Sequence, residues 1–246
     1  MRILVSIDDT DDLESRGTGE LASLIAADLE TNGWGKSSFV TRHQLLVHPD
    51  IPYTSHNSAM CFSAEIYADA LDEVIAHASS FLARESAAGS DPGLCVAAID
   101  GLAAPDEIIA FGRRAKESVM TKEEAYAAAR RLGVHLSEHG GTGQGVIGAL
   151  AGAGLRLGGN DGRLKGSIPL GPPGGVVSVA DLSRREDVDA VRAFDGRPLD
   201  GNEMVRVGEK VKTVMLEGKA VLLVTAAAAA DGPAWQTCPR QQLKRY

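Results

Sequence analysis

The sequence predicts an α/β protein with a mixed sheet and flanking helices, followed by a small β-rich C-terminal segment. The first observation is a strand, an acidic loop and a helix within residues 1–33. Strand-like and helix-like patterns then alternate as far as Leu155. Beyond Gly166, loops marked by proline and glycine and short apolar runs replace them. We therefore expect an α/β domain over residues 1–166 and a β-rich segment over residues 167–246.

The first strand and the first helix are placed by their periodicity. Ile3, Val5 and Ile7 alternate along residues 1–7, as in a strand with one buried face, and the run stops at a series of aspartates. From Thr18 the apolar residues recur at helical spacing, and Asn32-Gly33 supplies a C-terminal stop. The chain therefore begins with a β-loop-α unit.

The same reasoning places the elements that follow. We expect strands over residues 39–47, 59–67 and 94–99, and helices over residues 70–84 and from Pro105. Thr121 and Glu124 form a capping box for a further helix that ends at Gly133.

The second half of the chain is rich in glycine. Residues 140–145 predict a loop that enters a small-residue helix, where glycines 148, 152 and 154 permit close packing. Residues 135–139, just before this loop, do not predict a strand. Residues 205–225 predict short strands around a turn at Glu217-Gly218.

Composition excludes several classes of protein. The three cysteines lie far apart and form no C-x-x-C pair, which supports neither a disulfide framework nor a zinc ribbon and favours a reducing cytoplasm. We expect neither a signal peptide nor a membrane span, and hence a soluble cytoplasmic protein. A net charge of -8 argues against the broad positive surface that sequence-independent binding to nucleic-acid backbone requires, and leaves room for local basic patches.

The loop after the first strand carries the strongest chemical signal. Five carboxylates lie within seven residues, at Asp8, Asp9, Asp11, Asp12 and Glu14. Like charges this close repel unless a cation or solvent screens them, and Mg²⁺ takes one or two protein carboxylates alongside phosphate oxygens. This pattern predicts a magnesium site in the aspartate loop, and a solvated N-terminal turn is the alternative.

Two glycine-containing segments and one arginine are candidate phosphate contacts. Gly17, Thr18 and Gly19 stand where a helix begins, so their amides suit phosphate, although Thr18 as a simple N-cap is the alternative. Gly141, Thr142, Gly143 and Gly145 form a second such entry, with tight helix packing as its alternative. Arg42 is a candidate to neutralise phosphate, or to form a surface salt bridge. The sequence has no P-loop motif, and the G-x-G-x-x-G match from Gly143 does not support a Rossmann fold.

Taken in order, these segments resemble the kinase-like domain of the archaeal tRNA isoleucine agmatidine synthetase (agmatinylcytidine synthetase) family. The resemblance covers about the first two thirds of the chain and rests on five stretches, which are Ile7 to Asp11 with Thr18, Thr41-Arg42, His48-Pro49 and Ile51-Pro52-Tyr53 with Asn57, Asp91-Pro92-Gly93-Leu94, and Gly143 to Leu150. The chain departs from the family at Gly17-Thr18-Gly19, where the family has Cys-Thr-Thr, and at Thr54-Ser55-His56-Asn57, where the family has Lys-Thr-Arg-Gly-Asn. No zinc ribbon follows in this sequence, so we expect a shortened homologue of the family that lacks this module.

The resemblance implies an enzyme that uses ATP and Mg²⁺. It places catalytic and magnesium-binding roles on Asp8 and Asp9, and ties Thr18 to phosphoryl transfer; we extend the catalytic site to Asp11 and the nucleotide contacts to Thr10. We therefore predict an ATP- and Mg-dependent phosphotransferase or ligase. A tRNA-modifying ligase acting on a cytidine and a catalytically inactive nucleotide- or ligand-binding module are the alternatives.

The charge balance bears on the acceptor. Acidic residues outnumber basic ones 33 to 25, and aromatic residues make up only 4% of the chain. Modifying a base within a folded RNA requires many phosphate contacts and platforms for stacking. We therefore expect a small-molecule acceptor rather than structured tRNA.

Overall fold

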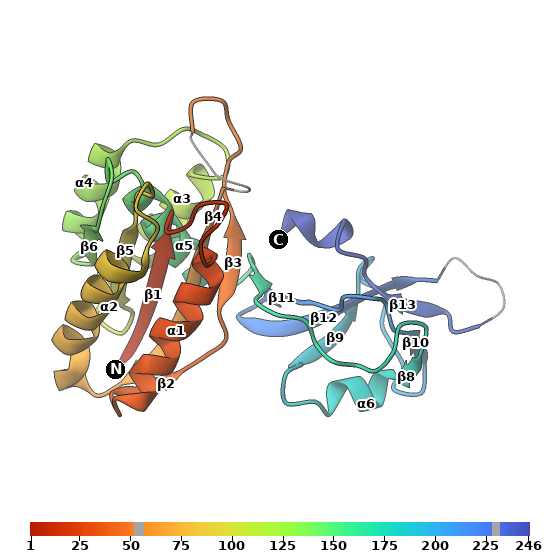
Figure 1. Ribbon diagram of the computed structural model, residues 1–246. Helices are drawn as coiled ribbons and strands as arrows, with labels where there is room; N and C mark the ends of the chain where they lie inside the picture. The colour runs from red at the N-terminus through yellow and green to blue at the C-terminus, as the bar shows by residue number, and fades with distance from the viewer. Residues whose placement is uncertain (52–56, 228–231) are drawn as a thin grey trace. The chain divides into compact units, whose positions relative to one another are not determined.

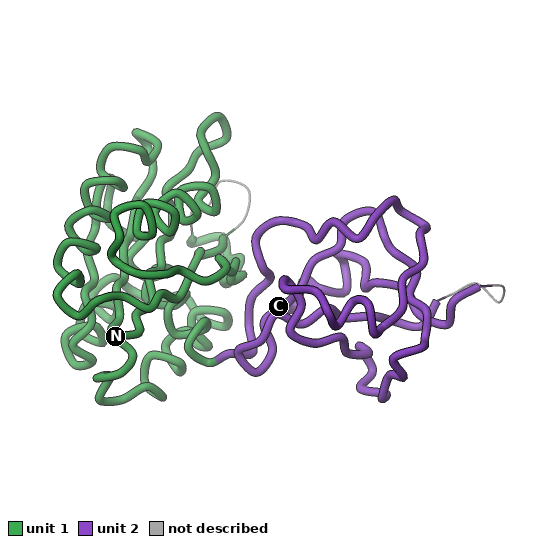
Figure 2. The backbone as a smooth tube through the Cα atoms, turned by 90° about the horizontal axis from the view of Figure 1, so that it is seen from below, with its two compact units in different colours: residues 1–158 green, residues 159–246 purple. Residues whose placement is uncertain are grey.

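The computed structural model describes residues 1–51, 57–227 and 232–246. The residues of the resemblance at positions 52–56 and most of the alanine run at 226–230 lie outside this part of the chain. The chain forms two compact units, Met1–Gly158 and Gly159–Tyr246 (Figure 2). The division falls at the end of a helix, before the boundary at residue 166 expected from the loop composition.

Unit 1 is a layered α/β structure (Figure 1). Its elements in chain order are β1 (Arg2–Asp8), α1 (Thr18–Thr31), β2 (Gly35–Ser37), β3 (Thr41–Gln44), β4 (Ser58–Ile66), η1 (Ala68–Ala70), α2 (Leu71–Glu85), β5 (Gly93–Ala98), α3 (Pro105–Arg114), α4 (Lys122–Leu132), β6 (His135–Glu138) and α5 (Gly145–Gly158). The strands lie in the order β6-β5-β1-β4-β3, and β2 pairs with β4. These pairings are antiparallel.

The alternation along β1 sorts its side chains between two cores. Ile3, Val5 and Ile7 pack in the core that also holds Leu21 and Leu29 of α1. Leu4 instead packs in the core that contains the apolar side chains of α3, α4 and α5. The predicted strand-loop-helix unit is confirmed, and its period-2 pattern explains why the two core clusters lie against β1.

Helix α5 packs on the sheet through its glycines. A Cβ at Gly152 would lie 2.8 Å from the Cβ of Ala59 in β4, and one at Gly154 would lie 2.0 Å from the carbonyl oxygen of Ile108 in α3. The predicted close packing at these positions is confirmed. Any side chain larger than hydrogen would push α5 off its neighbours.

One expectation for the segment before α5 is wrong. Residues 135–138 form strand β6 at the edge of the sheet, although their sequence shows no apolar alternation. The Ser137 hydroxyl lies 2.9 Å from the imidazole of His135 in this strand and 2.8 Å from that of His139, the residue after it. Polar side chains that hydrogen-bond one another are suited to a half-buried strand at the edge of a sheet. The strand pairs antiparallel with β5, so the glycine-rich segment after it is not a Rossmann turn.

Unit 2 is the β-rich segment that the composition predicts. Its elements are β7 (Arg163–Leu164), β8 (Val176–Ser178), α6 (Val179–Ser183), β9 (Ala190–Ala193), β10 (Met204–Arg206), β11 (Thr213–Leu216), β12 (Lys219–Ala226), β13 (Trp235–Thr237) and η2 (Gln242–Arg245). Its strands lie in the order β7-β11-β12-β13-β10-β8, with β9 beside β12. The pairs β10–β13 and β9–β12 are parallel, so the whole fold is the mixed α/β type predicted. No helix in the described part of the chain is long and apolar enough to span a membrane.

Candidate functional site

The C-terminal end of β1 buries a carboxylate. Asp8 is only 8% exposed and lies on the same side of the strand as α5. A Cβ at Gly148 would stand 1.6 Å from Asp8 Oδ2, so the absence of a side chain at position 148 makes room for this carboxylate. Burial, reinforced by the charge of Asp9, raises the pKa of Asp8 to about 8.

Asp9 turns the chain out of the strand. Its φ is +51°, in the left-handed region that aspartate tolerates better than most residues. The Asp9 carboxylate lies near the backbone N–H of Asp91, just before β5. Burial and the charge of Asp91 raise the pKa of Asp9 to about 6. Two neighbouring carboxylates thus resist ionisation, a situation that a bound cation reverses.

The acidic loop returns to contact the start of α1. Thr18 Oγ1 donates a hydrogen bond of 3.0 Å to Asp11 Oδ1. The N-cap of α1 is Gly17, and Thr18 is the first helical residue, so the simple N-cap role considered for Thr18 is wrong. The amides of Thr18 and Gly19 donate to no acceptor in the part of the chain that the structure describes. They are the open end of the helix, which favours an anion.

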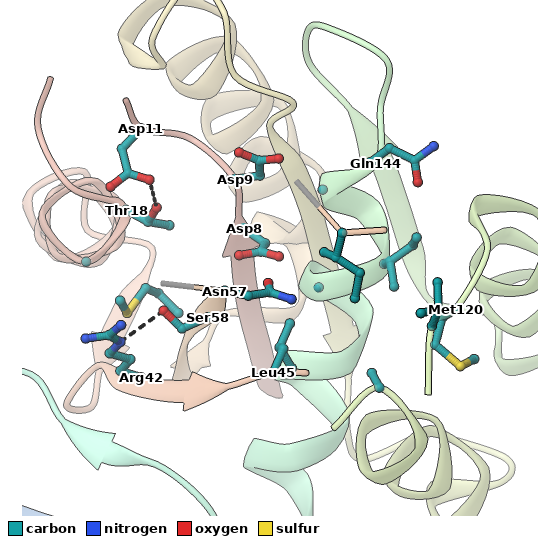
Figure 3. A pocket seen from close by; sticks show the side chains of 18 of the residues that line it. Asp8, Asp9, Asp11, Thr18, Arg42, Leu45, Asn57, Ser58, Met120 and Gln144 are labelled. Atoms are coloured by element: carbon teal, nitrogen blue, oxygen red, sulfur yellow. Dashed lines mark hydrogen bonds between the residues drawn. The ribbon is translucent and has the colours of Figure 1, made fainter. Parts of the chain in front are cut away.

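These groups face a cavity of about 560 Å³ that lies within unit 1. Its lining residues are Asp8, Asp9, Asp11, Gly17, Thr18, Gly19, Arg42, Leu45, Asp50, Ile51, Asn57, Ser58, Met60, Ala115, Ser118, Val119, Met120, Gln144, Gly145, Ile147 and Gly148. In Figure 3, Asp8 lies between the Thr18–Asp11 pair on one side and Gln144 on the other. Strand β1 and the starts of α1 and α5 therefore converge on one space, a common arrangement for a small-molecule site.

The cavity contains one arginine among its described lining residues. Arg42 lies on β3, and its Nε donates a 2.9 Å hydrogen bond to Ser58 Oγ on β4 (Figure 3). The predicted contact residue is thus placed at the cavity, held by the neighbouring strand. A guanidinium opposite buried carboxylates provides positive charge for an anionic ligand.

Another part of the cavity lining is apolar, and little in the sequence indicates it. Ala115, Val119 and Met120, which connect α3 to α4, form this part together with Leu45 and Ile147. The one local hint is an apolar residue directly before the capping box that opens α4, as in a hydrophobic staple. That pattern predicts packing against the helix and carries no information about a cavity.

Four predicted contact residues lie away from the cavity lining. Thr10 is fully buried, and its hydroxyl finds no hydrogen-bond partner in the part of the chain described. Gly141, Thr142 and Gly143 precede α5, and both the amide and the hydroxyl of Thr142 donate to the Asp91 carboxylate. Of the second glycine-containing segment, the cavity is lined by Gly145, the first residue of α5.

The donor set fits magnesium in its chemistry. No group of three or more His, Cys, Asp or Glu side chains is arranged to hold a metal ion within residues 1–51, 57–227 and 232–246. Mg²⁺ needs only one or two protein carboxylates when phosphate and water supply the remaining oxygens. The observation that favours a cation is that the buried Asp8 carboxylate and the adjacent Asp9 line the same cavity, where burial raises the pKa of both groups and a cation would stabilise their charged forms.

Comparison with known proteins adds an independent observation. No protein-family model matches the chain, and no curated protein is significantly similar to it. Solved structures do match. The complex of TiaS with an isoleucine tRNA and ATP aligns with a TM-score of 0.55 and 26% identity, over 63% of this chain and 36% of that chain. Structures of TiaS are thus among the structural neighbours of this chain. The resemblance to agmatidine synthetases is thereby confirmed at the level of structure.

Two further structures give the same result. Apo TiaS, an agmatidine synthetase for an isoleucine tRNA, aligns with a TM-score of 0.54 and 26% identity, over 63% of this chain and 35% of that one. A tRNA fluorescent labeling enzyme aligns with a TM-score of 0.54 and 28% identity, over 63% and 36%. The chain therefore spans little more than a third of the length of TiaS. The matched share of this chain is close to that of unit 1, residues 1–158 of 246.

Proposed function

We propose that unit 1 binds ATP with Mg²⁺ and transfers or cleaves its terminal phosphoryl group. The observation that carries this proposal is the convergence of the buried Asp8 and Asp9 carboxylates and the Thr18–Asp11 pair on one cavity. Supporting it, structural neighbours of the chain have been solved as TiaS complexes with ATP and with AMPCPP and agmatine.

Each residue has a role that its position supports. Asp8 and Asp9 hold Mg²⁺, which supplies positive charge to the phosphates. The open amides of Thr18 and Gly19 donate to phosphate oxygens, and Arg42 neutralises charge from the β3 side. Asp11 orients the Thr18 hydroxyl and accepts its proton as that oxygen bonds to the terminal phosphorus, while the bond from that phosphorus to the bridging oxygen breaks and ADP leaves. Direct phosphate contacts at Thr10, Gly141, Thr142 and Gly143 stay predictions, and the cavity-lining Gly145 is the better-placed contact of that segment.

Calorimetric titration with ATP tests the proposal. Wild-type protein should bind ATP with Mg²⁺ at submillimolar concentration, and chelation of the metal should weaken that binding. Asp8→Asn should lose the effect of the metal, whereas Asp12→Asn, in the exposed turn that holds the Glu14 and Ser15 amides, should keep it. No binding by the wild type at millimolar ATP and Mg²⁺ would overturn the proposal. Sustained ATP consumption would separate an enzyme from an inactive nucleotide-binding module.

Two kinds of molecule are candidates for the acceptor of the phosphoryl group, an RNA and a small molecule. Neighbouring TiaS structures contain tRNA and agmatine, which favours an RNA-modifying role, and the comparisons give no support to a small-molecule acceptor over RNA. The net charge of -8 favours the small molecule that the composition predicts. Filter binding of total tRNA at low and moderate salt, with ATP turnover measured alongside, distinguishes them. Salt-sensitive micromolar binding with tRNA-stimulated turnover selects RNA, and turnover that is indifferent to tRNA excludes it.

A further inference from the structure

We propose that Asp91 is a positioning residue. It holds the glycine-rich loop before α5 close to Asp9, and this contact sets the width of the nucleotide cavity. This inference rests on the proposed function, because the two parts that Asp91 joins are the proposed metal-binding loop and the proposed phosphate-binding end of α5. Asp91 does not line the cavity and needs no contact with ligand.

Asp91 lies close to three residues at once. It lies two residues before Gly93, which pairs with Asp8 in the sheet, and its backbone N–H lies near the Asp9 carboxylate. Its carboxylate accepts from the backbone N–H of Thr142 through Oδ1 and from the Thr142 hydroxyl through Oδ2. Its backbone carbonyl accepts a 3.1 Å hydrogen bond from the N–H of Gly145, the first residue of α5. One residue therefore lies between the acidic loop that follows β1 and the start of α5.

The loop approaches Asp91 so closely that glycine is required. A Cβ at Gly141 would lie 1.7 Å from Asp91 Oδ1, and one at Gly145 would lie 2.0 Å from the Asp91 carbonyl oxygen. Gly141 also has a φ of +55°, which disfavours side chains independently of space. The contact is therefore built into the backbone as well as the side chains.

The other side of the loop is fixed by α4. Lys122 Nζ donates to Glu138 Oε2 over 2.8 Å and to the Thr142 carbonyl oxygen over 2.9 Å. Thr142 is thus held from both sides, although it is solvent-exposed. The two residues after the next glycine, Gln144 and Gly145, line the cavity, so a displaced loop displaces the start of α5.

The test uses Thr142→Val, which keeps the shape of the side chain and removes the hydroxyl, and Thr142→Ser, which restores the hydroxyl. Thr31→Val, at the exposed C-terminal residue of α1, controls for the substitution itself. Hydrogen exchange of the backbone amides of residues 141–147 is measured without nucleotide, and the Kd for ATP with Mg²⁺ is measured by calorimetry. We expect Thr142→Val to accelerate exchange and to weaken ATP binding about threefold to tenfold, as the loss of one exposed charge-assisted hydrogen bond allows. Thr142→Ser and Thr31→Val should match the wild type.

The outcomes separate this inference from the function on which it rests. A wild type that binds no ATP overturns the proposed function and the positioning role together. A wild type that binds, with Thr142→Val equal to it in Kd and exchange, overturns the positioning role alone. Asp91→Asn distinguishes positioning from a direct phosphate contact by Thr142. Weaker ATP binding in Asp91→Asn supports the positioning role. Tighter binding is the result expected when a negative charge beside phosphate is removed, and it overturns that role.

Discussion

Thr18 Oγ1 lies 3.0 Å from Asp11 Oδ1, so the first residue of α1 hydrogen-bonds back to the loop that precedes it. A hydroxyl paired with a carboxylate at the open end of a helix is suited to act on phosphate. Thr18→Val should therefore lower ATP consumption by about 100-fold or more, the usual scale for loss of a nucleophile or its base. Thr18→Ser should retain most of it. Equal turnover by Thr18→Val and the wild type would remove this hydroxyl from the mechanism.

Burial of Asp8 predicts a pH-dependent stability. The pKa of Asp8 is raised from 3.8 to about 8, so the metal-free folded protein holds a proton that the unfolded chain releases. This contribution is fully present below about pH 4 and is lost as the pH rises to about 8. In chelator at about pH 8.5, Asp8→Asn should have a free energy of unfolding about 1–3 kcal/mol above that of the wild type. Urea denaturation at about pH 5 and 8.5 measures this, and a difference between the two proteins that does not change with pH would contradict it.

Gly148 and Gly158 on α5 form a matched pair. Alanine at Gly148 places a Cβ 1.6 Å from Asp8 Oδ2, whereas alanine at Gly158 meets its nearest neighbour, Ile109 Cγ2, at 3.4 Å. Gly148→Ala should lower the free energy of unfolding by about 1–3 kcal/mol and abolish the effect of Mg²⁺ on ATP binding, because Asp8 must move. Gly158→Ala should leave both unchanged. Denaturation and calorimetry on the two variants measure the difference, and full metal dependence in Gly148→Ala would show that Asp8 does not bind the ion.

Arg42 should affect the binding of nucleotide more than stability. Arg42→Gln removes the positive charge near the cavity and should raise the KM for ATP about tenfold, the size expected for a charge-assisted contact. Arg2→Gln is the control, because Arg2 begins β1 at the opposite end from Asp8 and pairs with Asp100. Steady-state kinetics across ionic strengths gives the comparison. An unchanged KM in Arg42→Gln would place the phosphates away from β3.

The sequence predicted those parts of the fold that depend on local patterns. The alternation of Ile3, Val5 and Ile7 and the capping box at Thr121 are properties of neighbouring residues, and the structure confirms both. The strand at residues 135–138 was missed because its order comes from pairing with β5 and from the Ser137 hydroxyl. Strands β8, β9 and β13 are similarly short and are defined by partners distant in sequence.

The candidate site likewise contains residues that a local sequence pattern predicts and residues that only the folded chain brings together. The acidic loop and Thr18 were visible because a run of aspartates before a helix start is a local signal. The contact between Asp91 and Thr142 joins residues 51 positions apart, and no pattern in either segment indicates it. The apolar lining at Ala115, Val119 and Met120 was missed for the same reason, since only the folded chain brings the connection between α3 and α4 to the cavity that Asp8 also lines.

The left-handed backbone of Asp9 limits how mutational scans of the loop are to be understood. At a φ of +51°, β-branched and bulky side chains strain the main chain whatever their charge. A saturation library at this position would therefore score most substitutions as defective for reasons unrelated to a carboxylate. Only Asp9→Asn and Asp9→Gly leave the turn accessible, and the role of the Asp9 charge is to be judged from those two replacements alone.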